Sequence, residues 1–168
     1  MESQEGAGSL FRIYFPRAEG SPEASPNESI PKTPQSGSES ILVVEDDEQI
    51  RRFVESGLSS LGCRVLTASG GAAGLEICKA EPGPIDVIVS DIIMSEVSGP
   101  RFMTSALRLR PGVVAIYMSA YTEDAVLGLR RGNSETEFPL IMKPFDLESL
   151  SRLIRECLDK SDSADSSP

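Results

Sequence analysis

Several polar side chains in this sequence of 168 residues come directly after a short apolar run. The acidic run Glu45–Asp47 follows ILVV, Asp91 follows IDVIVS, Ser119 follows VVAIYM, and Lys143 follows LIM. If these runs are parallel strands, their carboxyl ends meet at one edge of a sheet. Carboxylates that lie so close together cannot all ionise cheaply, and a divalent cation relieves their repulsion. Mg²⁺ suits such a place because it binds through one or two carboxylates, waters and phosphate oxygens.

The same residues carry the groups that phosphoryl transfer needs. Lys143 and the hydroxyl of Ser119 could hold the oxygens of a phosphoryl group that the metal does not bind. Positioning and charge neutralisation supply most of the catalysis of such reactions. The nucleophile would then be a carboxylate, and the product an aspartyl phosphate.

The pattern between residues 41 and 160 alternates apolar β-branched runs with segments of helical periodicity. Five strands are predicted, at Ile41–Glu45, Cys63–Ala68, Ile85–Ser90, Val113–Met118 and Leu140–Met142. Helices are predicted at 50–61, 71–80, Pro100–Arg110, Thr122–Arg131 and Asp146–Asp159, with Asp47 and Asp146 as caps of the first and the last. Strand–helix units with short connections favour an α/β fold with a doubly wound parallel sheet.

The two ends of the chain differ from this middle part in composition. Residues 18–40 are rich in Pro, Ser, Glu and Gly, and such a segment buries too little apolar surface to offset its ordering entropy. We therefore interpret 18–40 as a flexible linker and 161–168 as a disordered tail. Residues 1–17 contain the strand-like run SLFRIYF after a glycine turn.

Composition excludes several classes of protein. The chain has no histidine, so it cannot contain a Ser-His-Asp unit or accept a phosphoryl group on an imidazole. Its three cysteines form no CxxC pair, which argues against a thiolate metal site and fits a reducing cytoplasmic compartment. A net charge of -10 argues against nucleic-acid binding. No apolar run is long enough to span a membrane, and no signal-peptide pattern is present, so no membrane contact is expected.

Four segments in order, ILVVEDDEQIR, IVSDIIMSEVSG, YMSA and IMKPF, resemble the receiver domain of two-component response regulators. The resemblance covers roughly Ile41 to Lys160 and assigns residues 41–160 to one receiver domain. It implies the flavodoxin-like (βα)5 fold with strand order 2-1-3-4-5. It also implies a phosphorelay role, in which a histidine kinase or a phosphotransfer protein supplies the phosphoryl group.

The resemblance assigns a role to each matching residue. Asp91 would be the phosphoacceptor, and Glu45, Asp46 and Asp91 would bind Mg²⁺ together with the backbone carbonyl of Ile93. Ser119 would contact the phosphoryl group, and Lys143 would pair with it. The bond from Lys143 to Pro144 is often cis in such domains, and cis bonds are far cheaper before proline than elsewhere.

Some positions depart from the common receiver pattern. Ser95 stands where many receivers have proline, and Leu140 stands where many have an aromatic switch residue. The residues two positions beyond the acceptor and the switch hydroxyl, which tune dephosphorylation, are Ile93 and Tyr121. An apolar group and a bulky ring there would restrict the attacking water and favour a long-lived phosphate.

Leu140 and the segment GLRRGNSETEFPL before it resemble receivers attached to hybrid sensor histidine kinases. Met1–Arg17 resembles the final hairpin of the ATP-binding domain of such kinases. The chain is therefore interpreted as the C-terminal end of a hybrid kinase, or its descendant, in which the receiver regulates the kinase. The donor histidine must then come from another chain or from a kinase segment absent here.

Other interpretations of these residues stay open. The chain could be a pseudo-receiver that binds partners without phosphorylation. A metal-dependent phosphatase of the aspartyl-phosphate type would place a second Asp two residues after the nucleophile, where Ile93 follows Asp91. As a receiver, the chain is not expected to be an enzyme beyond its own phosphorylation and hydrolysis. Its expected output surface for a downstream protein spans Ala125–Arg131 and Leu147–Arg155, and transcriptional output from this chain is not expected.

Overall fold

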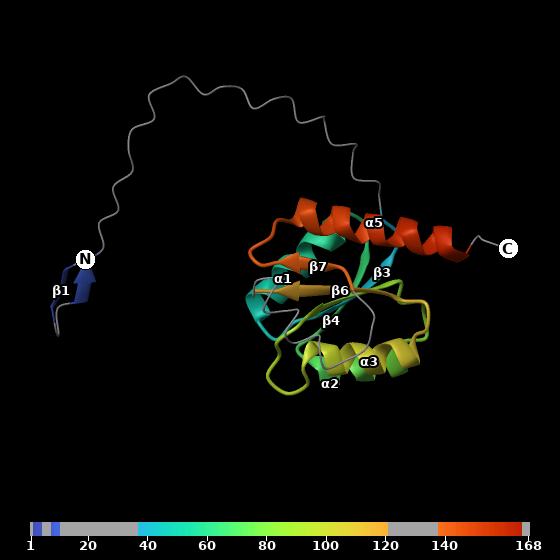
Figure 1. The fold of residues 1–168 in the computed structure, drawn as a ribbon, viewed down its shortest axis with the longest axis horizontal. Helices are drawn as coiled ribbons and strands as arrows, with labels where there is room; N and C mark the ends of the chain where they lie inside the picture. The colour runs from blue at the N-terminus through green and yellow to red at the C-terminus, as the bar shows by residue number, and fades with distance from the viewer. Residues whose placement is uncertain (1, 5–7, 11–36, 121–137, 166–168) are drawn as a thin grey trace, which may run out of the picture. The chain divides into compact units, whose positions relative to one another are not determined.

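The computed structural model describes residues 2–4, 8–10, 37–120 and 138–165 (Figure 1). It divides into two units, Met1–Thr33 and Pro34–Pro168, which are described separately. In the first unit, β1 (Glu2–Gln4) pairs with β2 (Gly8–Leu10) in antiparallel orientation, with Ser3 opposite Ser9. This small hairpin lies within residues 1–17, and the resemblance of that segment to the end of a kinase ATP-binding domain stays a prediction. The remainder of the predicted strand, from Phe11 on, lies outside the described residues, as does most of the predicted linker.

The second unit is built on a five-stranded parallel sheet in the order β4-β3-β5-β6-β7. The strands are β3 (Ser40–Val44), β4 (Arg64–Ala68), β5 (Val87–Asp91), β6 (Val114–Ser119) and β7 (Leu140–Met142). Counted within this unit, the order is 2-1-3-4-5, and the predicted fold class is confirmed. The order places β3 and β5 side by side in the middle of the sheet, so the residues that follow these two strands are neighbours.

Helices cover both faces of this sheet (Figure 1). On one face lie α1 (Glu48–Ser60) and α5 (Leu147–Asp165), and on the other lie α2 (Gly71–Ala80) and α3 (Gly99–Leu109). The helix predicted at Thr122–Arg131, which carries part of the expected output surface, lies outside the described residues. Because both faces are covered, the central strands are apolar at successive positions rather than alternating.

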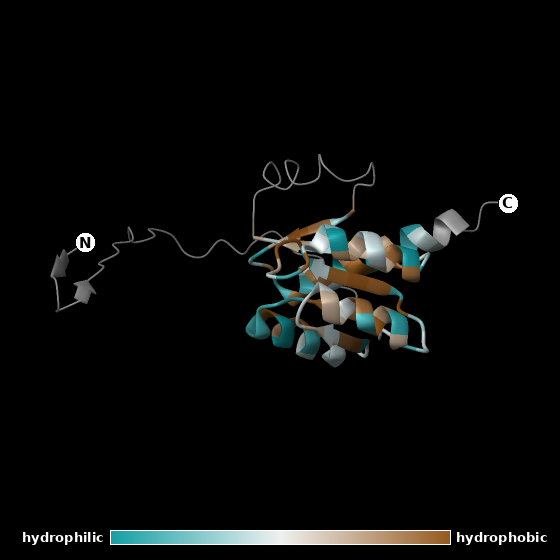
Figure 2. Cartoon of the chain, turned by 90° about the horizontal axis from the view of Figure 1, so that it is seen from below, coloured by the Kyte–Doolittle hydropathy of each residue, from teal (hydrophilic) through white to brown (hydrophobic). Residues whose placement is uncertain are grey.

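The core has two halves that meet at the sheet. Ile41 and Val43 of β3 pack with Leu58 of α1 on one side, and Leu42 and Val44 pack with the α2–α3 side on the other. All these side chains are at most 1% exposed. Figure 2 shows the strands in brown between helices that carry hydrophilic residues on their outer faces. The packing fixes each strand in register and therefore fixes where its last residue lies.

The last helix differs from the prediction at its end. Asp146 caps it as expected, because Ser149 N donates a hydrogen bond of 2.7 Å to Asp146 Oδ1. The predicted end at Asp159 is wrong, since α5 continues to Asp165, and the predicted disordered tail does not begin at residue 161. The sequence did not indicate this extension because the residues after Asp159 are mostly polar. In this part of the helix the Ser161 hydroxyl donates a hydrogen bond to the carbonyl of Leu158.

We predict that the α1 side of the core is essential for stability. Leu58→Ala removes a side chain that is 1% exposed and should lower the free energy of unfolding by about 2–5 kcal/mol. The same change at Leu109, which is 42% exposed, should cost about 0.5 kcal/mol or less. Urea denaturation of both variants measures the difference, and equal losses would contradict this account of the core.

Candidate functional site

Three carboxylates gather at the carboxyl edge of the sheet. Glu45 and Asp46 follow β3, and Asp91 is the last residue of the neighbouring strand β5. One carboxylate oxygen from each of the three lies within 4.8 Å of the others. Glu45 is buried, Asp91 is mostly buried, and Asp46 is exposed. The sheet order, rather than nearness in sequence, brings these predicted site residues together.

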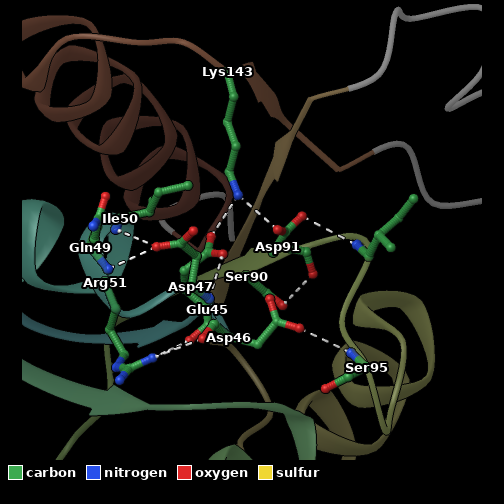
Figure 3. A network of polar contacts seen from close by, with 11 residues as sticks. Glu45, Asp46, Asp47, Gln49, Ile50, Arg51, Ser90, Asp91, Ser95 and Lys143 are labelled. Atoms are coloured by element: carbon green, nitrogen blue, oxygen red, sulfur yellow. Dashed lines mark hydrogen bonds and ion pairs between the residues drawn. The ribbon is translucent and has the colours of Figure 1, made fainter. Parts of the chain in front are cut away.

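Lys143, the residue directly after β7, extends its side chain toward these carboxylates (Figure 3). Its Nζ lies 2.7 Å from Glu45 Oε2 and 2.7 Å from Asp91 Oδ2. The backbone N–H of Lys143 donates to the carbonyl of Ser119 at 2.6 Å, and the bond from Lys143 to Pro144 is cis, as the resemblance implied. One ammonium group is thus shared by two carboxylates, in a place where the lysine side chain is only 12% exposed.

For Glu45 and for Lys143, burial and the hydrogen bonds of Lys143 shift the pKa in opposite directions. Burial raises the pKa of Glu45, although the hydrogen bond from Lys143 opposes this, and the negative charge of Asp91 raises the pKa further. Burial by itself would lower the pKa of Lys143, but the hydrogen bonds to Asp91 and Glu45 outweigh it, and the pKa is raised overall. Lys143 therefore stays protonated at neutral pH and holds the two acids near each other.

The loop after β5 is folded back on Asp91. The N–H of Ile93 donates to Asp91 Oδ1 at 3.2 Å, and the N–H of Gly99 donates to the carbonyl of Ile92 at 2.9 Å. A Cβ on Gly99 would lie 2.1 Å from the backbone carbonyl oxygen of Asp91, so this close approach requires glycine. The same loop places the N–H of Ser95 3.0 Å from Asp46 Oδ2 (Figure 3).

The turn between β3 and α1 is held by an arginine that the sequence analysis did not single out. Arg51 Nη1 donates to the backbone carbonyls of Glu45 at 2.8 Å and Asp46 at 3.4 Å. Asp47 faces α1 instead, and its Oδ1 accepts from the N–H groups of Gln49 and Ile50. An arginine one turn into a helix that follows an acidic strand end is too common a pattern to have indicated this contact.

The structure describes three of the four other predicted site residues. Ser119 ends β6 and is 1% exposed. The Ile93 side chain is 47% exposed, which leaves it beside the site rather than in the core. Leu140 begins β7 opposite Tyr117 and is partly buried against the α2–α3 side of the core. Tyr121 lies outside the described residues, so its predicted influence on the site stays a prediction.

The donor set fits a hard divalent cation. Such cations prefer carboxylate and carbonyl oxygens, and the cluster offers three carboxylates within one small space. Lys143 neutralises part of their charge, but one ammonium cannot balance three carboxylates, so the site keeps a net negative charge. A cation held by Glu45, Asp46 and Asp91 would complete that balance.

This fold and this cluster define a class of protein. The parallel sheet has this strand order, carboxylates lie at the ends of β3 and β5, and a lysine follows β7. This is the arrangement of a flavodoxin-like receiver. Residues 41–155 match the family described as "Response regulator receiver domain". The chain belongs to this family, as the sequence motifs implied.

Relatives with known names agree with this assignment. The chain is 33% identical to "Sensor kinase CckA" of Brucella abortus, in an alignment that covers 96% of this chain and 18% of that protein. It is 30% identical to "Transcriptional regulatory protein GlrR" of Escherichia coli K12, over 72% of this chain and 26% of that protein. The chain therefore spans only a small part of the length of these curated relatives.

Solved structures show the same fold. The receiver domain from the hybrid histidine kinase CckA is 28% identical, with a TM-score of 0.60, over 71% of this chain and 98% of that one. A CheY-like receiver domain protein from Methanospirillum hungatei JF-1 is 28% identical, with a TM-score of 0.64, over 76% of this chain and 99% of that one. Among the helices that the structure describes, none is long and apolar enough to cross a bilayer.

We predict that Lys143 stabilises the fold by pairing the two acids. Lys143→Met leaves Glu45 buried without its cation, which should lower the free energy of unfolding by about 3–5 kcal/mol at neutral pH without divalent ions. Lys79→Met is the matched control, because Lys79 pairs with Glu76 on the exposed surface and should cost about 0–1 kcal/mol. Denaturation curves with a chelator present measure the free energy of unfolding of both variants. Similar losses would show that the buried ion pairs stabilise the fold no more than the exposed one.

Proposed function

We propose that this chain accepts a phosphoryl group on Asp91 from a phosphohistidine, and that the modification switches its binding to a downstream partner. The observation that carries the proposal is the position of Asp91, which ends a central strand between Lys143 and two further carboxylates. A carboxylate oxygen of Asp91 would attack phosphorus, the P–N bond to the imidazole would break, and the imidazole would keep the electron pair. The product is an aspartyl phosphate.

Each neighbouring group has a part in this proposal. Mg²⁺, held by Glu45, Asp46, Asp91 and the backbone carbonyl of Ile93, would neutralise the charge of the phosphoryl oxygens. Lys143 lies 2.7 Å from Asp91 Oδ2, near enough to pair with the phosphoryl group once it is attached. Ser119 ends the adjacent strand β6, so its hydroxyl is the candidate second contact.

The donor and the output are proposed from the family. The chain has no histidine, so the donor is a histidine kinase or a phosphotransfer protein. The added charge would pull Ser119 and Lys143 toward the phosphate and change the surface formed by the last two strand–helix units. The chain would work in the cytoplasm, and it would not act as an enzyme on a separate substrate, since Ile93 stands where a phosphatase of this type has its second acid.

A second arrangement is favoured by one comparison. The similarity to the sensor kinase CckA covers 96% of this chain, including most of its first forty residues, and not only the receiver. We infer that the receiver could belong to a hybrid histidine kinase and regulate it. A CckA-type kinase labelled with radioactive ATP should then transfer label to this chain but not to an Asp91→Asn variant, and equal labelling by unrelated kinases would argue against this origin.

The central prediction concerns Asp91 directly. Incubation with Mg²⁺ and acetyl phosphate should add the mass of one phosphoryl group to the wild-type chain, because Asp91 is the proposed nucleophile. Intact mass spectrometry measures the adduct. Asp91→Asn is the matched variant, nearly equal in size, and should gain no adduct. A wild-type chain that stays unmodified would support the pseudo-receiver alternative instead.

We further predict that the phosphate is long-lived. The exposed Ile93 side chain offers no polar group to position an attacking water near Asp91. Phosphorylated protein freed of donor should therefore lose its label slowly, and Ile93→Asn should lose it faster because an amide can orient that water. Label that disappears from the wild type within seconds would contradict this hypothesis.

A further inference from the structure

Asp46 is held in a different way from its two acidic neighbours. Glu45 is buried and bonded to Lys143, and Asp47 caps the first turn of α1. Asp46 is exposed, and its Oδ2 accepts a hydrogen bond of 3.0 Å from the backbone N–H of Ser95, 49 positions along the chain. The contact joins the turn after β3 to the loop after β5, and Figure 3 shows it on the far side of the cluster from Arg51.

A carboxylate on an exposed turn is free to rotate unless something holds it. A backbone N–H that donates to a charged carboxylate makes a stronger hydrogen bond than one to a neutral acceptor, so the bond favours one orientation of the carboxylate. Since a carboxylate has two oxygens, a bond on Oδ2 leaves Oδ1 of Asp46 available for a cation. Hydrogen bonds of this kind to metal ligands orient them and raise the affinity for the metal.

The backbone N–H of Ser95, which donates to Asp46, lies in a loop that several contacts hold in place. The loop that carries Ser95 is closed by the bonds from Ile93 to Asp91 and from Gly99 to Ile92. The start of α2 packs against the same loop, because a Cβ on Gly71 would lie 2.9 Å from Val97. The N–H of Ser95 is therefore fixed relative to Asp91, and through it the orientation of Asp46 is tied to the proposed acceptor.

We propose that the backbone N–H of Ser95 is a positioning group that holds Asp46 in the orientation in which it binds the divalent cation. The proposal rests on the magnesium site of the proposed function. The contact is a feature of this chain, since proline, which many receivers have at this position, has no N–H to donate. The side chain of Ser95 has no part in the proposal.

The test compares two substitutions at the same position. Ser95→Ala keeps the N–H and removes the hydroxyl, and Ser95→Pro removes the N–H. Isothermal titration of the full chain with MgCl₂ should give a wild-type Kd for Ser95→Ala and a Kd about 10–100-fold weaker for Ser95→Pro. Melting curves in a chelator should be similar for both variants, because the contact lies on an exposed loop.

Two results would overturn the proposal: a Ser95→Pro variant that binds Mg²⁺ as the wild type does, or a Ser95→Ala variant that is weakened equally. A wild-type chain that binds no Mg²⁺ would instead reject the proposed metal site itself. If Ser95→Pro does not fold, hydrogen exchange of the Ser95 amide tests the bond to Asp46 instead. The Ser95 amide should exchange slowly in the wild type and faster in Asp46→Ala, and equal rates would contradict the proposed bond.

Discussion

The site depends on one buried ammonium group shared between two carboxylates. Glu45 and Asp91 repel each other in a place almost closed to water, and Lys143 lies 2.7 Å from each. Such an arrangement is stable only when all three groups are held accurately, because removing one partner leaves a buried charge unpaired. The packed strands behind them supply that accuracy. The apolar core therefore positions the cluster by fixing where β3, β5 and β7 end.

Lys143 does not balance the three carboxylates of the cluster, so this edge of the sheet carries a net negative charge. Three carboxylates and one lysine form an acidic cluster whose oxygens are of the kind that a small hard cation prefers. The loops around the cluster hold it mainly through backbone groups: the carbonyls that Arg51 binds and the N–H groups of Ile93 and Ser95. Loop conformation, and not only side-chain identity, therefore controls the site.

Much of this could be predicted from the sequence because the strands are short, apolar and separated by helical periodicity. The convergence of Glu45, Asp91 and Lys143 followed from the expectation that parallel strands end at one edge. The contacts of Arg51 and of the Ser95 N–H did not follow, since one uses a common residue and the other uses no side chain. The extension of α5 to Asp165 was also missed, because its last residues carry no apolar pattern.

The short strand β7 has a consequence for the sheet as a whole. It is an edge strand of only three residues, and it is followed at once by Lys143 and by Pro144, which has no N–H. An edge strand offers unpaired backbone groups to any other chain that can add a strand, and a short edge that ends in a charge and a proline offers few. A short edge strand followed by a charge and a proline is one of the ways in which natural sheets limit the addition of further strands.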